Sequence, residues 1–97
     1  MSKGYWMGHV VVTDAEAYGR YREANAVPFA KYGARFLARG GQAEEVEGAQ
    51  GRVRHVIIEF PSYEIALACW NSPEYAAAKA ERVGAGDAYI TVVEGAD

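Results

Sequence analysis

The chain has 97 residues, of which 51% are hydrophobic and 24% charged, a balance that predicts one folded domain over residues 1–97 with a single core. The formal net charge of -3 argues against a nucleic-acid partner, and no stretch approaches the ~18 apolar residues of a membrane span. The N-terminus lacks the apolar run of a signal peptide, and the one cysteine, Cys69, excludes an internal disulfide, so we expect a cytoplasmic protein.

The first predicted strand covers residues 5–12, and a helix should begin directly after it. Two residues compete to cap this helix. Thr13 has capping-box spacing to Glu16, and Asp14 is the alternative cap. The charge of Asp14 is favourable at a helix N-terminus in either case.

An aromatic stripe, interrupted by one amide, follows at steps of three and four residues. Its members are Tyr18, Tyr21, Asn25, Phe29 and Tyr32. Pro28 removes a helical hydrogen bond and crowds the turn before it, so the helix should kink or restart near Asn25. We expect Asn25 to cap the second piece and Gly33 to end it.

Residues 34–47 contain the second predicted strand, in which Gly40-Gly41 has two interpretations. The pair forms either a hairpin turn or a bulge that bends one long strand and lets it continue to Val46. We favour the bulge, because the glycine-rich run 48–51 is the better turn into the next strand.

Residues 53–75 form the central unit of the chain. A strand over 53–60 is stopped by Pro61, which has no N–H for a sheet ladder, and Ser62 should cap a helix directly after it. Cys69 and Trp70 share the apolar face of this helix, so the helix should pack back on the strand and bury the thiol.

Ser72 before Pro73 repeats the cap-then-proline pattern, which predicts a short helix to about Val83. The last strand is expected over residues 88–93. The order β-α-β-β-α-β predicts an α+β, ferredoxin-like fold, in which a four-stranded antiparallel sheet carries the helices on one face.

Alternate positions of the predicted strands separate the sheet into two faces. In the first strand the even positions, from Trp6 to Val12, are wholly apolar and should meet the helices. The opposite face is mixed in polarity but still too apolar for open water. It holds Met7, Val11, Leu37 and Ile57. We therefore expect this face to join two copies of the chain in a homodimer.

Four segments together resemble a known family: 12–18, 34–41, 56–62 and 70–75, for example Val-Ile-Ile-Glu-Phe-Pro-Ser and Trp-Asn-Ser-Pro-Glu-Tyr. They are similar to the domain of unknown function 1330 (DUF1330) family, over about residues 4–95. The resemblance implies a dimeric α/β barrel, two ferredoxin-like subunits joined sheet to sheet, and no established reaction. The wider superfamily includes cofactor-free monooxygenases, lactone isomerases and haem-degrading enzymes. By analogy of fold, it implies a small-molecule cavity between sheet and helices.

Two residues of the mixed face are candidate catalytic groups. Glu59 sits in an apolar strand, where an unpaired carboxylate is costly, so it is the best candidate acid or base. We favour the structural alternative, an ion pair with Arg39 or Arg35. His9 is a candidate proton carrier, although a hydrogen-bonded interface histidine is the favoured interpretation.

The candidate ligand-binding residues come mainly from the aromatic stripe. They are Asn25, Arg39, Tyr18, Tyr21 and Trp70. Capping of the second helical piece is a simpler explanation for Asn25 than ligand binding. Aromatic side chains at helical spacing belong more often to the core than to a binding site. The two histidines and Cys69 lack zinc-site spacing, and no cofactor fingerprint is present, so we expect neither metal nor cofactor.

Two classes of function follow. The first is an enzyme or binding protein that handles a small organic molecule without a cofactor, in a cavity between sheet and helices. The second is a non-catalytic dimeric module whose mixed face serves only the dimer. A cavity of roughly 300 Å³ or more, lined by Glu59, would favour the first class.

Overall fold

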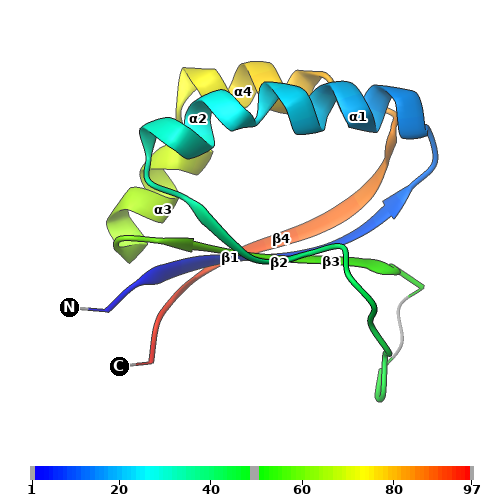
Figure 1. Ribbon diagram of the computed structural model, residues 1–97, viewed down its shortest axis with the longest axis horizontal. Coiled ribbons are helices and arrows are strands. Elements are labelled where there is room, and N and C mark those ends of the chain that lie inside the picture. The colour runs from blue at the N-terminus through cyan, green and yellow to red at the C-terminus, as the bar shows by residue number, and fades with distance from the viewer. Residues whose placement is uncertain (1, 49–50, 97) are drawn as a thin grey trace.

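The computed structural model describes residues 2–48 and 51–96. Its elements in chain order are β1 (Gly4–Val12), α1 (Ala15–Ala24), α2 (Ala26–Lys31), β2 (Arg35–Arg39), β3 (Arg54–Phe60), α3 (Tyr63–Trp70), α4 (Pro73–Ala80) and β4 (Gly86–Glu94). The strands form one antiparallel sheet in the order β2-β3-β1-β4. Figure 1 shows the helices on one side of this sheet, so the predicted α+β, ferredoxin-like arrangement is confirmed. No helix in the described ranges is long and apolar enough to span a membrane.

Side-chain caps start three of the helices. Asp14, rather than Thr13, caps α1 by accepting a hydrogen bond from the Ala17 N–H at 3.1 Å. Ser62 and Ser72 cap α3 and α4 in the same way, as the sequence predicts. Helix α4 ends at Ala80, a few residues before the expected Val83, and the chain continues there in turns.

The predicted break between α1 and α2 is present at Asn25, but the predicted cap is wrong. Asn25 has helical backbone angles, and its side chain makes no capping hydrogen bond. Its backbone carbonyl instead accepts from the N–H of Phe29 at 3.1 Å, so helical bonding runs through the junction. The amide side chain is therefore available for another role.

Strand β2 corrects the interpretation of Gly40-Gly41. The strand ends at Arg39 and does not continue to Val46, and no two-residue hairpin replaces it. The irregularity lies earlier, because Phe36 pairs with Ile58 whereas Ala38 pairs with Ile57, which leaves Leu37 as an extra residue. The predicted turn at 48–51 includes residues 49–50, which lie outside the described residues.

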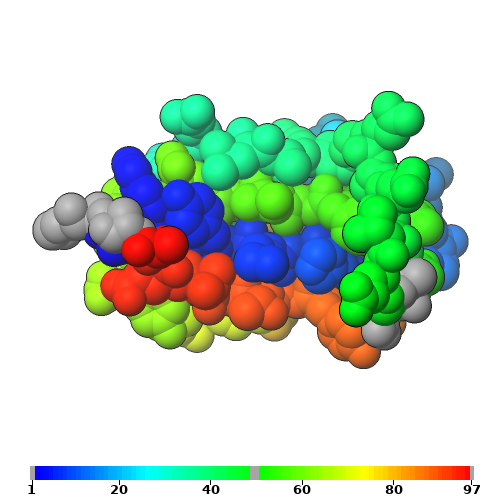
Figure 2. All heavy atoms as spheres, turned by 90° about the horizontal axis from the view of Figure 1, so that it is seen from below, coloured from blue at the N-terminus to red at the C-terminus, as the bar shows by residue number. Residues whose placement is uncertain are grey.

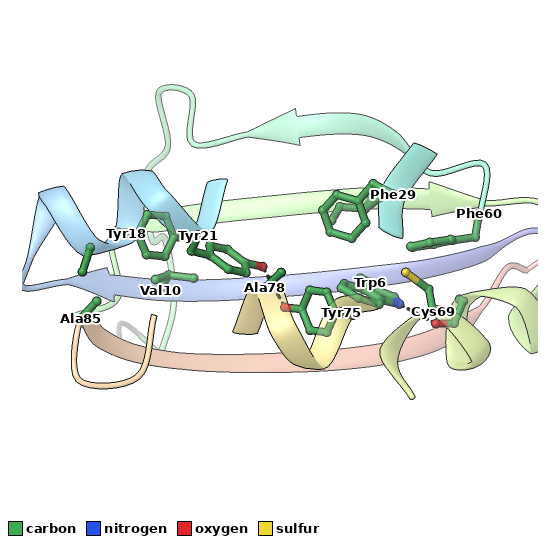
Figure 3. Close-up of a cluster of buried hydrophobic side chains, with 13 residues drawn as sticks. Trp6, Val10, Tyr18, Tyr21, Phe29, Phe60, Cys69, Tyr75, Ala78 and Ala85 are labelled. Atoms are coloured by element: carbon green, nitrogen blue, oxygen red, sulfur yellow. Dashed lines mark hydrogen bonds between the residues drawn. The ribbon is translucent and has the colours of Figure 1, made fainter. Parts of the chain in front are cut away.

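The core lies between the sheet and the helices, with Trp6 of β1 at its centre. The Trp6 ring lies 4.9–5.5 Å, between ring centroids, from four aromatic side chains, most of them edge-on. These are Phe29, Phe60, Trp70 and Tyr75. The Trp6 indole N–H donates to the Ala66 carbonyl at 2.9 Å, which ties β1 to α3. Figure 3 shows Trp6 together with Phe29, Phe60 and Tyr75, which come from both helices and strands.

Strand β1 passes beneath α3 so closely that Gly4 leaves no room for a side chain. A Cβ on Gly4 would meet the Ser62 carbonyl. Together with the Trp6 anchor, this close approach fixes how the helix layer sits on the sheet.

The opposite face of the sheet carries no helix and is shown in Figure 2. Large apolar side chains on it remain 39–55% exposed. They are Met7, Leu37, Ile57, Tyr89 and Val93. The alternation of buried and exposed residues along β1 follows the predicted parity. Figure 1 also shows the green segment that follows β2 extending past this open face.

Candidate functional site

A small cavity of about 40 Å³ lies between the helices and the sheet. Its walls come from all four strands and from α1 and α2. They include Trp6, Tyr18, Tyr21, Arg22, Asn25, Phe29, Phe36, Arg39, Val56 and Ile90. A single buried water needs roughly 10–15 Å³ and a drug-sized ligand roughly 300 Å³ or more. The cavity therefore holds a group of only a few non-hydrogen atoms.

Local rules of helix and strand geometry bring these side chains together. Tyr18, Tyr21 and Asn25 recur at steps of three and four, so the last turns of α1 present them on one face toward the sheet. On β2 the extra residue Leu37 shifts the side-chain alternation by one. Arg39, which pairs with Val56, therefore joins Phe36 on the helix side of the sheet.

The open side of the cavity is marked by its two exposed lining residues, Arg22 and Arg39. The Arg39 guanidinium carbon lies 4.0 Å from the centre of the Phe36 ring, within the range of a cation–π contact. Burial lowers the pKa of Arg39 from its ordinary value, and the neighbouring cations Arg22 and Arg54 lower it further. The entrance is therefore positive, in front of an aromatic interior.

The inner polar groups form a chain of hydrogen bonds. Asn25 is only 4% exposed, and its amide hydrogen-bonds with Tyr21. The hydroxyls of Tyr21 and Tyr75 lie 2.8 Å apart and point toward one another in Figure 3. Arg82 donates to the Tyr75 hydroxyl at 3.4 Å. The chain runs from the α1–α2 junction to the segment after α4.

Tyr21 stays a neutral phenol in this network. Burial raises its pKa well above the ordinary value, and the neighbouring Tyr75 raises it further. Near neutral pH the hydroxyl can donate and accept hydrogen bonds, but it does not act as a base. No carboxylate or imidazole lines the cavity within residues 2–48 and 51–96.

The two candidate catalytic residues lie on the open sheet face, away from the cavity. Glu59 accepts a 3.5 Å hydrogen bond from the Tyr5 hydroxyl. Among the described residues it has no arginine within 4.0 Å, so the expected ion pair with Arg39 or Arg35 is not formed. Arg35 stands opposite Glu59 in the strand register without pairing with it, and Arg39 faces the helices.

His9 pairs with His55 across β1 and β3. The two Nδ1 atoms lie 2.8 Å apart, a hydrogen bond in which one ring donates and the other accepts. The pair lines an open depression of about 420 Å³ on the same face, together with Arg52 and Tyr89. Glutamates of the segment after β2 form its other side.

Four of the five predicted ligand-binding residues meet at the cavity, namely Tyr18, Tyr21, Asn25 and Arg39. Trp70 does not line it. Its ring packs against Trp6 and Tyr75, and the Lys79 ammonium lies 4.8 Å from its centre. Cys69 is fully buried, as expected, and burial raises the pKa of its thiol to about 12.

Arg22 and Phe36 are among the lining residues that sequence reasoning did not name as candidates. Arg22 follows Tyr21 and lies one turn after Tyr18, so its place beside the aromatic stripe offered a signal. Strand alternation alone places Phe36 on the helix side of the sheet. Arg39 lies on the same side only because of the bulge at Leu37.

These features define a ferredoxin-like domain with one bare sheet face and a small aromatic cavity under its helices. The chain belongs to the family described as Domain of unknown function (DUF1330), whose model matches residues 3–96. No curated protein matches it.

Solved structures share the fold at low sequence identity. The RPA0582 protein of unknown function from Rhodopseudomonas palustris is 19% identical, with a TM-score of 0.77 over 99% of this chain and 84% of that one. SnoaB, a cofactor-independent oxygenase from Streptomyces nogalater, is 9% identical, with a TM-score of 0.66 over 100% and 96% of the two chains. A dimeric ferredoxin-like protein of unknown function from Jannaschia sp. CCS1 is 14% identical, with a TM-score of 0.62 over 94% and 97%. At these identities the likeness shows the fold alone.

Proposed function

We propose that the protein is a homodimer that binds a small organic molecule in the cavity beneath α1 and α2. The observation that carries this proposal is Asn25, a buried amide among aromatic side chains that caps no helix. An amide offers two donors and two acceptor lone pairs, and the bond with Tyr21 uses only one of these. The remaining capacity is suited to a polar ligand atom.

The small volume favours a small ligand. About 40 Å³ is far below the roughly 300 Å³ of a drug-sized site. Glu59 does not line the cavity, so neither the volume nor the carboxylate expected for an enzyme of this kind is found there. The same volume favours the alternative, a dimeric module without a ligand. Glu59 and His9 stay candidates for chemistry only at the open face, where a second subunit would cover them.

Dimerisation through the open face is supported by its apolar side chains. Met7, Ile57 and Val93 are each 39% exposed there, although they alternate with buried or partly buried residues on the helix side of the sheet. The segment after β2 extends past the same face, where it would reach a partner subunit (Figure 1). The Jannaschia protein, which shares the fold, is dimeric, and this supports the same state for the present chain.

Titration of ¹⁵N-labelled protein with small uncharged and charged organic fragments, followed by NMR, tests the binding proposal. Butyramide and butyrate are suitable probes, because each has a short apolar body and one polar head. At least one fragment should shift the Asn25 side-chain amide and the Trp6 indole signal. Asn25→Leu should abolish the shift of the Trp6 indole signal while the protein stays folded. Asn71 is the matched control, because it is exposed at the end of α3 and does not line the cavity, and Asn71→Ala should bind normally. If both probes leave the cavity signals unchanged at high millimolar concentration, the binding proposal is wrong.

A further inference from the structure

Three arginines gather at the open side of the cavity, each from a different element. Arg22 lies in the last turn of α1, Arg39 ends β2 and Arg54 begins β3. The guanidinium carbon of Arg39 lies 4.0 Å from the centre of the Phe36 ring, and that of Arg54 lies 5.5 Å from the centre of the Tyr18 ring. Both rings line the cavity. The aromatic walls therefore hold two of the cations beside the entrance.

Gly40 makes room for this cluster. The Arg54 guanidinium lies directly against the Gly40 backbone, so a Cβ at Gly40 would displace the guanidinium from this position. Gly40 also has a φ of 70°, which a residue with a side chain rarely adopts. The chain therefore bends sharply after Arg39, at the point where Arg39 and Arg54 approach each other.

No acidic side chain of the described residues neutralises the cluster. Within the described parts of the chain, no carboxylate oxygen lies within 4.0 Å of Arg22, Arg39 or Arg54, whereas Arg20 and Arg52 both have such partners. The Nε of Arg54 is buried and has no hydrogen-bond partner among residues 2–48 and 51–96. This absence is notable in a chain with 13 acidic residues and 10 lysines and arginines.

Like charges held this close repel each other, and burial strengthens the repulsion. The lowered pKa of Arg39, caused first by burial and then by Arg22 and Arg54, reflects this cost. An anion at the entrance would remove the repulsion and fill the unused donors. A guanidinium binds a carboxylate through two parallel hydrogen bonds, which makes arginine well suited to this anion.

Building on the cavity binding proposed above, we infer that the ligand is a small organic carboxylate. Its short apolar body enters between Trp6, Phe29 and Phe36, and its carboxylate stays at the entrance on Arg22, Arg39 and Arg54. The volume of about 40 Å³ limits the inserted body to a few carbon atoms. The aromatic wall directly behind the cations calls for an anion that carries an apolar group, which inorganic phosphate lacks.

The test compares butyrate with butyramide, which have the same apolar body but differ in charge, by NMR titration of the full-length protein. Butyrate should bind at least tenfold more tightly, and this advantage should shrink as the salt concentration rises. Arg39→Gln and Arg22→Gln should each remove most of the advantage. Arg35→Gln is the matched control, because Arg35 lies on the same strand but opposite Glu59, and it should keep the advantage.

The possible outcomes separate this inference from the binding proposal. Equal or tighter binding of butyramide at the cavity overturns the carboxylate assignment and leaves the binding proposal standing. An equal loss in Arg35→Gln would also overturn it, because the effect would then be one of overall charge. Tighter binding of inorganic phosphate than of butyrate would assign the arginines to phosphate instead. If neither butyrate nor butyramide reaches the cavity, both the inference and the binding proposal fail.

Discussion

The buried hydroxyl pair of Tyr21 and Tyr75 gives a quantitative prediction. Tyr21→Phe deletes one oxygen atom, and with it the 2.8 Å bond to Tyr75 and the hydrogen bond with Asn25. Tyr75 keeps its 3.4 Å bond from Arg82, but Asn25 is only 4% exposed and has little access to water. A net hydrogen bond contributes about 1 kcal/mol, and an unsatisfied buried amide adds a penalty. The free energy of unfolding should therefore fall by about 2 kcal/mol.

Urea unfolding followed by tryptophan fluorescence measures this loss, with Tyr18→Phe as the matched control. Tyr18 lies one turn earlier on α1 and is also buried, but within the described residues its hydroxyl makes no hydrogen bond. Tyr18→Phe should change stability by less than about 0.5 kcal/mol. Equal losses in the two variants would refute the network as a source of stability. A double-mutant cycle with Tyr75→Phe should then show a coupling between Tyr21 and Tyr75 of about 1 kcal/mol.

Three further predictions concern pH, assembly and the open face. Burial and Tyr75 raise the Tyr21 pKa above its ordinary 10.0, so above about pH 10 the unfolded chain loses this proton and the folded chain keeps it. The free energy of unfolding of the wild type should then fall more steeply with rising pH than that of Tyr21→Phe, and the two slopes should differ by up to about 1.4 kcal/mol per pH unit. Urea titrations at alkaline pH measure both slopes, and parallel curves would contradict the prediction. Ile57→Lys should yield monomers in size-exclusion with light scattering, because it buries a charge in a symmetric contact, whereas Val27→Lys, in α2 on the helix side of the sheet, should leave dimers. Glu59→Gln should lower stability by less than about 1 kcal/mol in thermal melts, because among the described residues Glu59 has only the long hydrogen bond from Tyr5. A loss of ~3 kcal/mol would instead indicate a buried ion pair at Glu59.

Signals that act within a few residues were sufficient to predict most of the fold. Ser62 and Ser72 cap helices because a hydroxyl reaches the N–H three residues later, a rule that needs no tertiary contact. The two faces of β1 followed from the strict alternation of side chains along a strand, and the pairing of β1 with β3 has no bulge that would disturb it. These elements and their order fixed the ferredoxin-like arrangement.

The two main errors concern Arg39, which a contact between distant segments displaces, and Asn25, through which helical bonding continues instead of restarting. The extra residue at Leu37 is visible only in the pairing of β2 with β3, and it moves Arg39 to the face opposite Glu59. Strand alternation alone therefore placed Arg39 beside Glu59. Asn25 was interpreted as a cap from its position before Pro28, but helical bonding continues through it, so its side chain lies one turn after Tyr21 and lines the cavity. The candidate site depends on Arg39 and Asn25. The sequence therefore indicated which residues form the site better than it indicated how their side chains are arranged.

A crystal structure of the protein grown with butyrate tests the central claim of ligand binding most directly. We expect density for the carboxylate within hydrogen-bond distance of Arg39, with the apolar body reaching toward Phe29 and Asn25. Density for butyrate elsewhere on the surface, with only water in the cavity under α1 and α2, would contradict the claim.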